Sequence, residues 1–235
     1  MKTGEELIRR KIKEEQIYEA ILTTPSSLFF NFSAAGFRRK GKEVFLQIFQ
    51  GSDSYKNLKE KEVFGLTLLS SHKVTPFFKA AVLGWNEPEL TEFKKEELEF
   101  FCGIPFVKEG IIYLYCKVEE RKRENICNQI GSSEVLKIRA RIEDCKVKEE
   151  EQEVFSRAPA LFVEALVHYS KLKAGFEKKE NSWSLSQAMA YHLTSLKQIL
   201  NALKKMGWNE GDYREGCRFL ENEIRKWEQK KGRVK

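Results

Sequence analysis

The 235-residue chain lacks the sequence signals of most enzymes that act on small molecules. It contains no Gly-x-Ser-x-Gly nucleophile motif, no phosphate-binding P-loop and no dinucleotide fingerprint. Its five cysteines form no Cys-x-x-Cys pair, and its three histidines show no zinc-ligand spacing. We therefore expect no metal site and no disulfide framework, and the sequence names no catalytic residue.

Long apolar runs are also missing. No stretch approaches the ~20 residues needed to span a bilayer, and residues 1–15 are charged throughout, unlike a secretory signal. Hydrophobic residues make up 41% of the chain and charged residues 33%, as in an ordinary globular protein. We expect a cytoplasmic protein with no membrane partner, large enough for one big domain or two small ones.

The net charge of +7 is modest and uneven, since residues 177–235 carry 13 basic and 8 acidic residues. A second basic feature is the alternating segment Glu134–Val147, which places Lys137, Arg139 and Arg141 on one face. Such a ladder is typical of a solvated sheet face, and no recognised nucleic-acid motif accompanies it. We do not expect nucleic acid as a partner, although binding through the basic tail stays a third hypothesis.

The stretch Phe49–Leu58 predicts the end of a strand, a glycine turn and a short helix from Asn57. Gly51 can adopt a positive φ in the turn, and Ser52 can cap the helix. Four polar side chains crowd the start of this helix: Ser52, Ser54, Lys56 and Asn57. Together with the N–H groups of a helix N-terminus they suit a phosphate monoester. The alternative is an ordinary capped connection between two strands.

The rest of the chain predicts strands followed by helices. A charged helical lead-in covers residues 1–15, and an acidic spacer, Lys148–Glu153, marks a change in composition. Strand character is found in these segments: Ile17–Thr24, Leu28–Phe37, Val44–Phe49, Val63–Leu69, Ile112–Val118 and Glu134–Val147. After the spacer, amphipathic helices are expected over Arg157–Lys173, from Ser184 to just before Gly207, and after an Asn209 cap. We expect a turn at residues 131–133.

The basic segment Arg38–Lys42 is predicted to form a hairpin tip. It has two interpretations. The first is a solvated turn, and the second is that one arginine reaches back to an anionic ligand.

Three pieces of the sequence, in this order, resemble the FMN-binding split β-barrel proteins. They resemble most closely the prokaryotic family called domain of unknown function 447. The pieces are residues 19–24 with 31–37, Gly51–Leu58, and Ser156–Ala158 with the helix that follows. The chain departs from the family pattern at Pro25–Ser27, Leu66, Ser71 and Ser156, and Asp53 would repel a phosphate unless it points away.

The resemblance implies an α+β fold, with an FMN-binding split β-barrel over residues 1–153 and a C-terminal helical subdomain over residues 154–235. It implies FMN as cofactor, a homodimer and a small-molecule redox substrate. The matching phosphate positions are Ser52, Ser54, Lys56 and Asn57. The strand positions that would border the flavin ring are Thr23, Thr24, Asn31 and Gly36.

The resemblance supports one functional hypothesis above the others. The chain would be a flavin-reductase-like oxidoreductase whose substrate is not specified by the sequence. The alternative, favoured by the departures from the family pattern, is a split-barrel binding or regulatory module that has lost flavin chemistry.

Overall fold

The computed structural model describes most of the chain. The described residues are 4–26, 29–71, 73, 75–80, 93–128, 131–148, 153–177, 183–207 and 214–231. The chain divides into two compact units, residues 1–156 and 157–235. The division after residue 153 that the sequence suggested stays a prediction. No helix in the described ranges is both long enough and apolar enough to cross a membrane.

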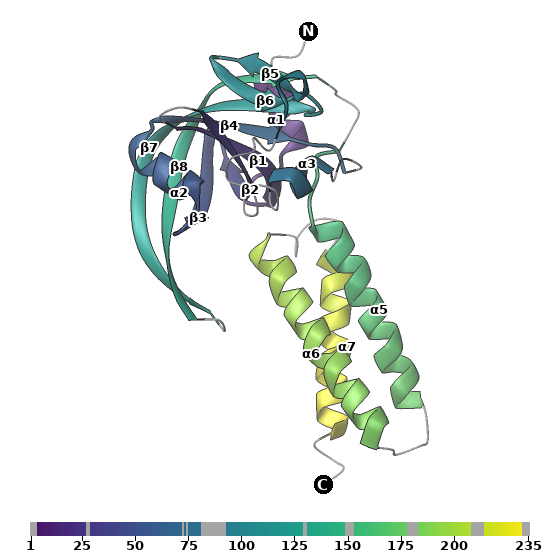
Figure 1. The fold of residues 1–235 in the computed structure, drawn as a ribbon. Coiled ribbons are helices and arrows are strands. Elements are labelled where there is room, and N and C mark those ends of the chain that lie inside the picture. Colours follow the sequence, from purple (N-terminus) through teal and green to yellow (C-terminus); the bar gives the residue numbers. More distant parts are fainter. Residues whose placement is uncertain are drawn as a thin grey trace. The chain divides into compact units, whose positions relative to one another are not determined.

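Six antiparallel strands close into a barrel in the first unit (Figure 1). They are β1 (Ile17–Pro25), β2 (Phe30–Lys40), β3 (Glu43–Phe49), β4 (Val63–Leu68), β7 (Ile112–Asn128) and β8 (Gly131–Val147). Their order around the barrel is β1-β2-β3-β8-β7-β4, and β4 pairs with β1 to close the ring. The predicted α+β fold, a β-barrel with helices that are mostly C-terminal, is confirmed.

A short hairpin outside the barrel was missed by the sequence analysis. It consists of β5 (Leu98–Phe101) and β6 (Ile104–Val107), joined by Cys102 and Gly103, whose φ angles are 49° and 77°. Two consecutive positive φ values are the mark of a tight hairpin turn, and Cys-Gly was the available signal. Phe106 of β6 lies over Gly65 of β4, where an added Cβ would come within 2.8 Å of the Phe106 ring. Gly65 is therefore required for this hairpin to pack on the barrel.

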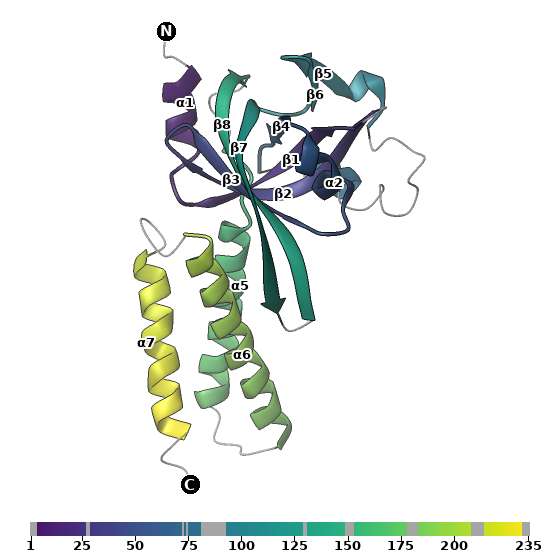
Figure 2. The same ribbon diagram turned by 90° about the vertical axis from the view of Figure 1, so that its left-hand side faces the viewer.

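Strand β7 is much longer than the predicted Ile112–Val118, β8 begins at Gly131 rather than Glu134, and both run past the ends of their neighbours (Figure 2). β4 pairs with β7 only as far as Lys117, and β3 pairs with β8 only as far as Val135. Beyond those points the two strands pair with each other, down to Asn128 opposite Gly131. The turn expected at residues 131–133 was wrong, because this part of the hairpin covers no core and so shows no apolar alternation.

The basic ladder on β8 is largely neutralised by acidic neighbours. Arg139 contacts three carboxylates, those of Glu43 (2.6 Å), Glu119 (2.7 Å) and Glu120 (3.1 Å). Lys137 lies 2.5 Å from Glu124. Such surface pairs contribute little to stability, but they leave this face without a strong positive charge.

The described residues of the first unit include four short helical segments: α1 (Gly4–Lys11), α2 (Asp53–Glu60), α3 (Thr75–Phe78) and the 3-10 turn η2 (Lys95–Glu97). The helical lead-in is confirmed by α1. Leu7 and Ile8 of α1 and the following Ile12 are buried, so α1 packs on the barrel through these apolar side chains.

The basic hairpin tip between β2 and β3 is not a solvated turn throughout. The side chain of Arg39 is only 2% exposed, and it is the largest fully buried side chain of the described residues. Its Nε donates to the Ile12 carbonyl at 2.8 Å, and its Nη1 donates to the Gly41 carbonyl at 2.8 Å. The carboxylate of Glu14 lies 3.3 Å from Nη1. Arg39 therefore ties the segment after α1 to the β2–β3 turn, and the first interpretation of this segment was wrong at Arg39.

Replacing Arg39 should destabilise the protein strongly. We expect Arg39→Met to lower the free energy of unfolding by about 2–4 kcal/mol, because the buried carbonyl of Ile12 and the partly buried carbonyl of Gly41 lose their donor. Urea unfolding followed by circular dichroism measures the change. The control is Lys40→Met at the neighbouring position, where the side chain is 67% exposed and its ion pair with Glu15 spans 4.0 Å. Equal losses in the two variants would contradict the assigned role.

The second unit consists of three helices, α5 (Ala158–Glu177), α6 (Trp183–Lys205) and α7 (Arg214–Lys231). All three were predicted. Their buried residues follow the expected stripes: Ala165, His168, Leu172, Leu193, Leu196, Leu200, Leu203, Cys217, Leu220, Ile224 and Trp227. Helix α5 ends at Glu177, beyond the predicted end at Lys173, and includes Gly175. The Asn209 cap lies outside the described residues.

Two histidines face each other between α5 and α6. Nδ1 of His168 lies 2.8 Å from Nδ1 of His192, and Nε2 of His168 lies 3.3 Å from a carboxylate oxygen of Glu164. Burial lowers the pKa of His192, and the nearby charges of His168 and Lys171 lower it further. The folded protein therefore disfavours a proton on His192.

We expect the free energy of unfolding to fall as the pH drops through 6.5, the ordinary pKa of histidine, because the unfolded chain then binds a proton that the folded chain resists. Urea unfolding at pH 7.5 and pH 5.5 tests this, with His192→Gln expected to show a smaller difference between the two pH values. Proton NMR of the His192 ring gives a direct check. A ring that titrates at or above 6.5 would refute the expectation.

Candidate functional site

Helix α2 begins as the sequence predicts, after a glycine turn and a serine cap. Gly51 has a φ of 96°, and the Ser52 hydroxyl oxygen accepts a hydrogen bond from the backbone N–H of Tyr55 at 3.1 Å. The helix starts at Asp53, four residues before the start expected from composition. The predicted cap and the positive φ are confirmed. The first turn of a helix has backbone N–H groups without an intrahelical partner, and in α2 the Ser52 hydroxyl binds one of them.

The inner face of α2 is joined to the barrel by hydrogen bonds between side chains. The buried Ser54 hydroxyl lies 2.8 Å from Nδ2 of Asn31 and 2.6 Å from the hydroxyl of Ser33, both on β2. Nδ2 of Asn57 donates to the Thr24 hydroxyl on β1 at 3.0 Å. We call these five residues the α2 cluster. Four of them were predicted site residues, and the structure brings them together.

Ser33 is the member of the α2 cluster that the sequence analysis missed. It lies two residues after Asn31 on β2 and therefore on the same face of the strand. That spacing was the available signal.

The outer face of α2 carries the predicted basic group. Nζ of Lys56 lies 2.8 Å from Asp53, and the two side chains are 69% and 63% exposed. Lys56 therefore extends toward solvent while Ser54 and Asn57 point inward. The Asp53 carboxylate is balanced by Lys56, so the start of α2 carries no net side-chain charge from this pair.

The C-terminal end of α2 is bound by a side chain of the barrel strand β7. Nε of Arg121 on β7 donates to the Leu58 carbonyl, and its Nη2 donates to the Lys61 carbonyl, both at 2.7 Å. A positive charge at the C-terminal end of a helix interacts favourably with the partial negative charge there. The helix is therefore fixed at both ends, which orients its N-terminus.

Thr23 is completely buried, and its hydroxyl oxygen has no hydrogen-bond partner among the described residues. It lies opposite Phe32 in the β1–β2 register, and it points to the other face of β1 from Thr24. A buried hydroxyl without a partner is costly in free energy, so it marks a position where a polar group could be received.

Gly36 lies away from the other predicted flavin positions. It pairs with Glu19, whereas Asn31 pairs with Thr24, five residues along the strand. At ~3.3 Å per residue the separation is about 16 Å. The structure therefore does not bring Gly36 together with the α2 cluster, and its proposed role at the flavin stays a prediction.

With the barrel and the α2 cluster defined, the chain can be compared with known proteins. Residues 18–153 match the family described as "Protein of unknown function (DUF447) N-terminal domain". That range covers more than half of the chain. The chain belongs to the DUF447 family.

Relatives of this DUF447 protein are distant in sequence. An uncharacterized protein of Methanocaldococcus jannaschii, MJ1453, is 23% identical over 194 residues, which are 83% of this chain and 92% of that protein. The crystal structure of the FMN-bound protein MM1853 from Methanosarcina mazei, assigned to DUF447, is 17% identical with a TM-score of 0.45, over 91% of this chain and 97% of that one. A flavin reductase domain protein from Arthrobacter is 13% identical with a TM-score of 0.46, over 62% and 86%.

The two neighbouring threonines of β1 should respond in opposite ways to the same substitution. Thr23→Val removes a hydroxyl that lacks a partner, and we expect the flavin-free protein to gain about 1 kcal/mol in its free energy of unfolding. Thr24→Val removes the acceptor of Asn57, and we expect a loss of about 1–2 kcal/mol. Urea unfolding of both variants provides the measurement. A loss in Thr23→Val as large as that in Thr24→Val would show that the Thr23 hydroxyl has a partner.

Proposed function

We propose that this DUF447 protein binds FMN and holds the FMN phosphate at the start of α2. The observation that carries the proposal is the α2 cluster, which fixes a short helix on the barrel with its N-terminus behind a Gly51-Ser52 turn. Helix N-termini bind phosphate through backbone N–H groups and the helix dipole. The FMN-bound Methanosarcina mazei protein of the same family supports the choice of cofactor.

The residues at this site fit a phosphate monoester on two counts. The Ser52 hydroxyl lies at the turn, and the Lys56 ammonium group lies on the exposed side of the same helix end. The Asp53 carboxylate opposes a phosphate, but it already contacts Lys56. A phosphate would therefore compete with Asp53 for Lys56. Ser54 and Asn57, which the family resemblance assigned to the phosphate, here hold the helix in place.

The flavin ring would lie against β1 and β2, where the family resemblance places Thr23, Thr24, Asn31 and Gly36. Thr23 is completely buried and points to the opposite face of β1 from Thr24, so we assign it no contact with the flavin. When bound, FMN would supply the redox chemistry, and the protein would position the cofactor and control access to it. The function that follows is a flavin-reductase-like oxidoreductase with a small-molecule redox substrate.

A homodimer belongs to the same proposal. Three large apolar side chains of the first unit are exposed to solvent: Phe29 (69%), Phe100 (62%) and Phe49 (49%). Exposed aromatic side chains of this size are characteristic of interfaces between protein chains. Sedimentation analysis of the full chain tests the dimer.

The first test of the cofactor is an absorbance spectrum of the freshly purified protein, followed by FMN titration of any colourless preparation. We expect a yellow protein that releases FMN, or saturable binding of added FMN. A protein that binds neither FMN, FAD nor riboflavin would reject the proposal and favour a binding or regulatory module without flavin chemistry.

The double variant Ser52→Ala with Lys56→Ala tests the phosphate site. We expect FMN affinity to fall roughly tenfold to a hundredfold, because charge-assisted hydrogen bonds to the phosphate are lost. Riboflavin, which has no phosphate, should bind the variant and the parent protein alike. Fluorescence quenching of the flavin gives both affinities.

The matched control is Lys59→Ala, which removes the same charge from the last turn of α2. We expect it to change FMN affinity less than about twofold. Unchanged FMN affinity in the double variant would contradict a phosphate site at the start of α2, but it would not contradict FMN binding by the protein.

A further inference from the structure

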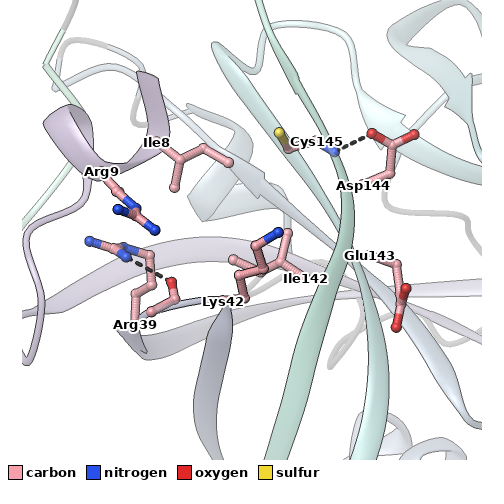
Figure 3. Close-up of a pocket in the computed structure, with 9 residues that line it drawn as sticks. Ile8, Arg9, Arg39, Lys42, Ile142, Glu143, Asp144 and Cys145 are labelled. Atoms are coloured by element: carbon pink, nitrogen blue, oxygen red, sulfur yellow. Dashed lines mark hydrogen bonds between the residues drawn. The ribbon is translucent and has the colours of Figure 1, made fainter. Parts of the chain in front are cut away.

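The first unit contains a cavity of about 140 Å³ between α1, the β2–β3 turn and β8 (Figure 3). Pockets for drug-sized ligands have volumes of ~300–1,000 Å³, so this cavity suits a compact ligand and is too small for a flavin. It lies apart from the α2 cluster, since none of its lining residues belongs to α2 or to that cluster.

Three cations line this cavity, and each comes from a different segment. Arg9 comes from α1, Arg39 from β2 and Lys42 from the β2–β3 turn. Arg39 is buried at the base, while Arg9 and Lys42 are exposed at the rim. The apolar side chains of Ile8 and Ile142 complete the wall.

Two acidic residues of β8, Glu143 and Asp144, are part of the same lining, but they extend from the other side of the strand in Figure 3. The register of β7 and β8 shifts at this point, from Cys116 opposite Ile142 to Tyr115 opposite Asp144. The Asp144 carboxylate accepts a hydrogen bond from the Cys145 backbone N–H at 2.7 Å, and Cys102 Sγ lies 3.6 Å from its other oxygen. These contacts engage the Asp144 carboxylate, and the lining as a whole carries three cations against two carboxylates.

The guanidinium of Arg39 is held rigidly at the base of this cavity. Its Nε and Nη1 donate to backbone carbonyls, and the Glu14 carboxylate beside it is 51% exposed. Burial lowers the pKa of Arg39, the Glu14 charge raises it, and the charge of the nearby Arg9 lowers it again. Two guanidinium groups that repel each other across a small cavity would both be stabilised by an anion between them.

We propose that this cavity is a binding site for a single oxyanion group, the carboxylate or phosphate of a small ligand. Arg39 provides a preorganised donor at the base, and Arg9 and Lys42 bind the anion at the rim. Guanidinium groups match the geometry of carboxylate and phosphate oxygens, and charge-assisted hydrogen bonds to such groups are strong. Ile8 and Ile142 would contact a short apolar part of the ligand. The proposal does not depend on flavin binding.

The test is a titration of the full ¹⁵N-labelled chain with inorganic phosphate and, separately, with propanoate, each at ionic strength matched with sodium chloride. We expect saturable shifts of the backbone amides of residues 8–9, 41–42 and 142–145, with a Kd of about 1 mM or below for at least one probe. The tighter probe identifies phosphate or carboxylate as the preferred group. Shifts that grow linearly with both probes and match those of chloride would overturn the proposal.

The double variant Arg9→Gln with Lys42→Gln should weaken binding of the preferred probe at least about tenfold, because both rim cations are lost while the structural contacts of Arg39 remain. The matched control is Arg10→Gln with Lys40→Gln, which removes the same charge from the same two segments outside the cavity. We expect a change below about twofold in this control. Equal weakening in the two double variants would show a general charge effect and would refute a defined site.

Discussion

Closure of the barrel is the constraint on which the rest of the first unit depends. It requires β3 to pair with β8, so that Val44 lies opposite Ala140 although most of the unit separates them in sequence. Each strand then has two hydrogen-bonded neighbours, and neither side of the sheet remains an open edge. Closure also decides where the connections lie. It sets α2, which directly follows β3, against β1 and β2, and it sets the β2–β3 turn beside α1 and β8.

Polar contacts, rather than apolar burial alone, position α2 on this barrel. Ser54 and Asn57 bond to β1 and β2, and Arg121 from the long β7–β8 hairpin binds the other helix end. Hydrogen bonds are directional, so they fix the orientation of the helix more narrowly than apolar contacts would. A phosphate site built on a helix N-terminus needs that orientation. Thr23 is completely buried and points to the opposite face of β1 from Thr24, so it takes no part in holding the helix.

Arg39 has no contact with the α2 cluster, and it combines a structural role with a place in the proposed anion site. Its buried guanidinium connects the segment after α1 to the β2–β3 turn, and the same group forms the base of the cationic cavity. A buried charge is stabilised only when its hydrogen-bonding groups are satisfied. The backbone carbonyls of Ile12 and Gly41 accept two hydrogen bonds from Arg39. An oxyanion in the cavity would in addition balance the positive charges of Arg39 and Arg9.

The sequence by itself determined the elements that have a strong local signal. Strand-type composition predicted the barrel strands, helped by alternation in Ile112–Val118 and Glu134–Val147. Apolar stripes predicted the three C-terminal helices, and the Gly51-Ser52 pair predicted the turn and cap before α2. Local signals were too weak for the β5–β6 hairpin, whose strands have four residues each, and for the β7–β8 extension, which covers no core. Only the tertiary structure decided which polar residues meet. Ser33 and Asn31 join Ser54, and Asn57 joins Thr24, because contacts between a helix and strands distant in sequence follow from the closed fold. For the same reason, the sequence showed Arg39 only as one residue of a basic turn, and its burial is evident only in the tertiary structure.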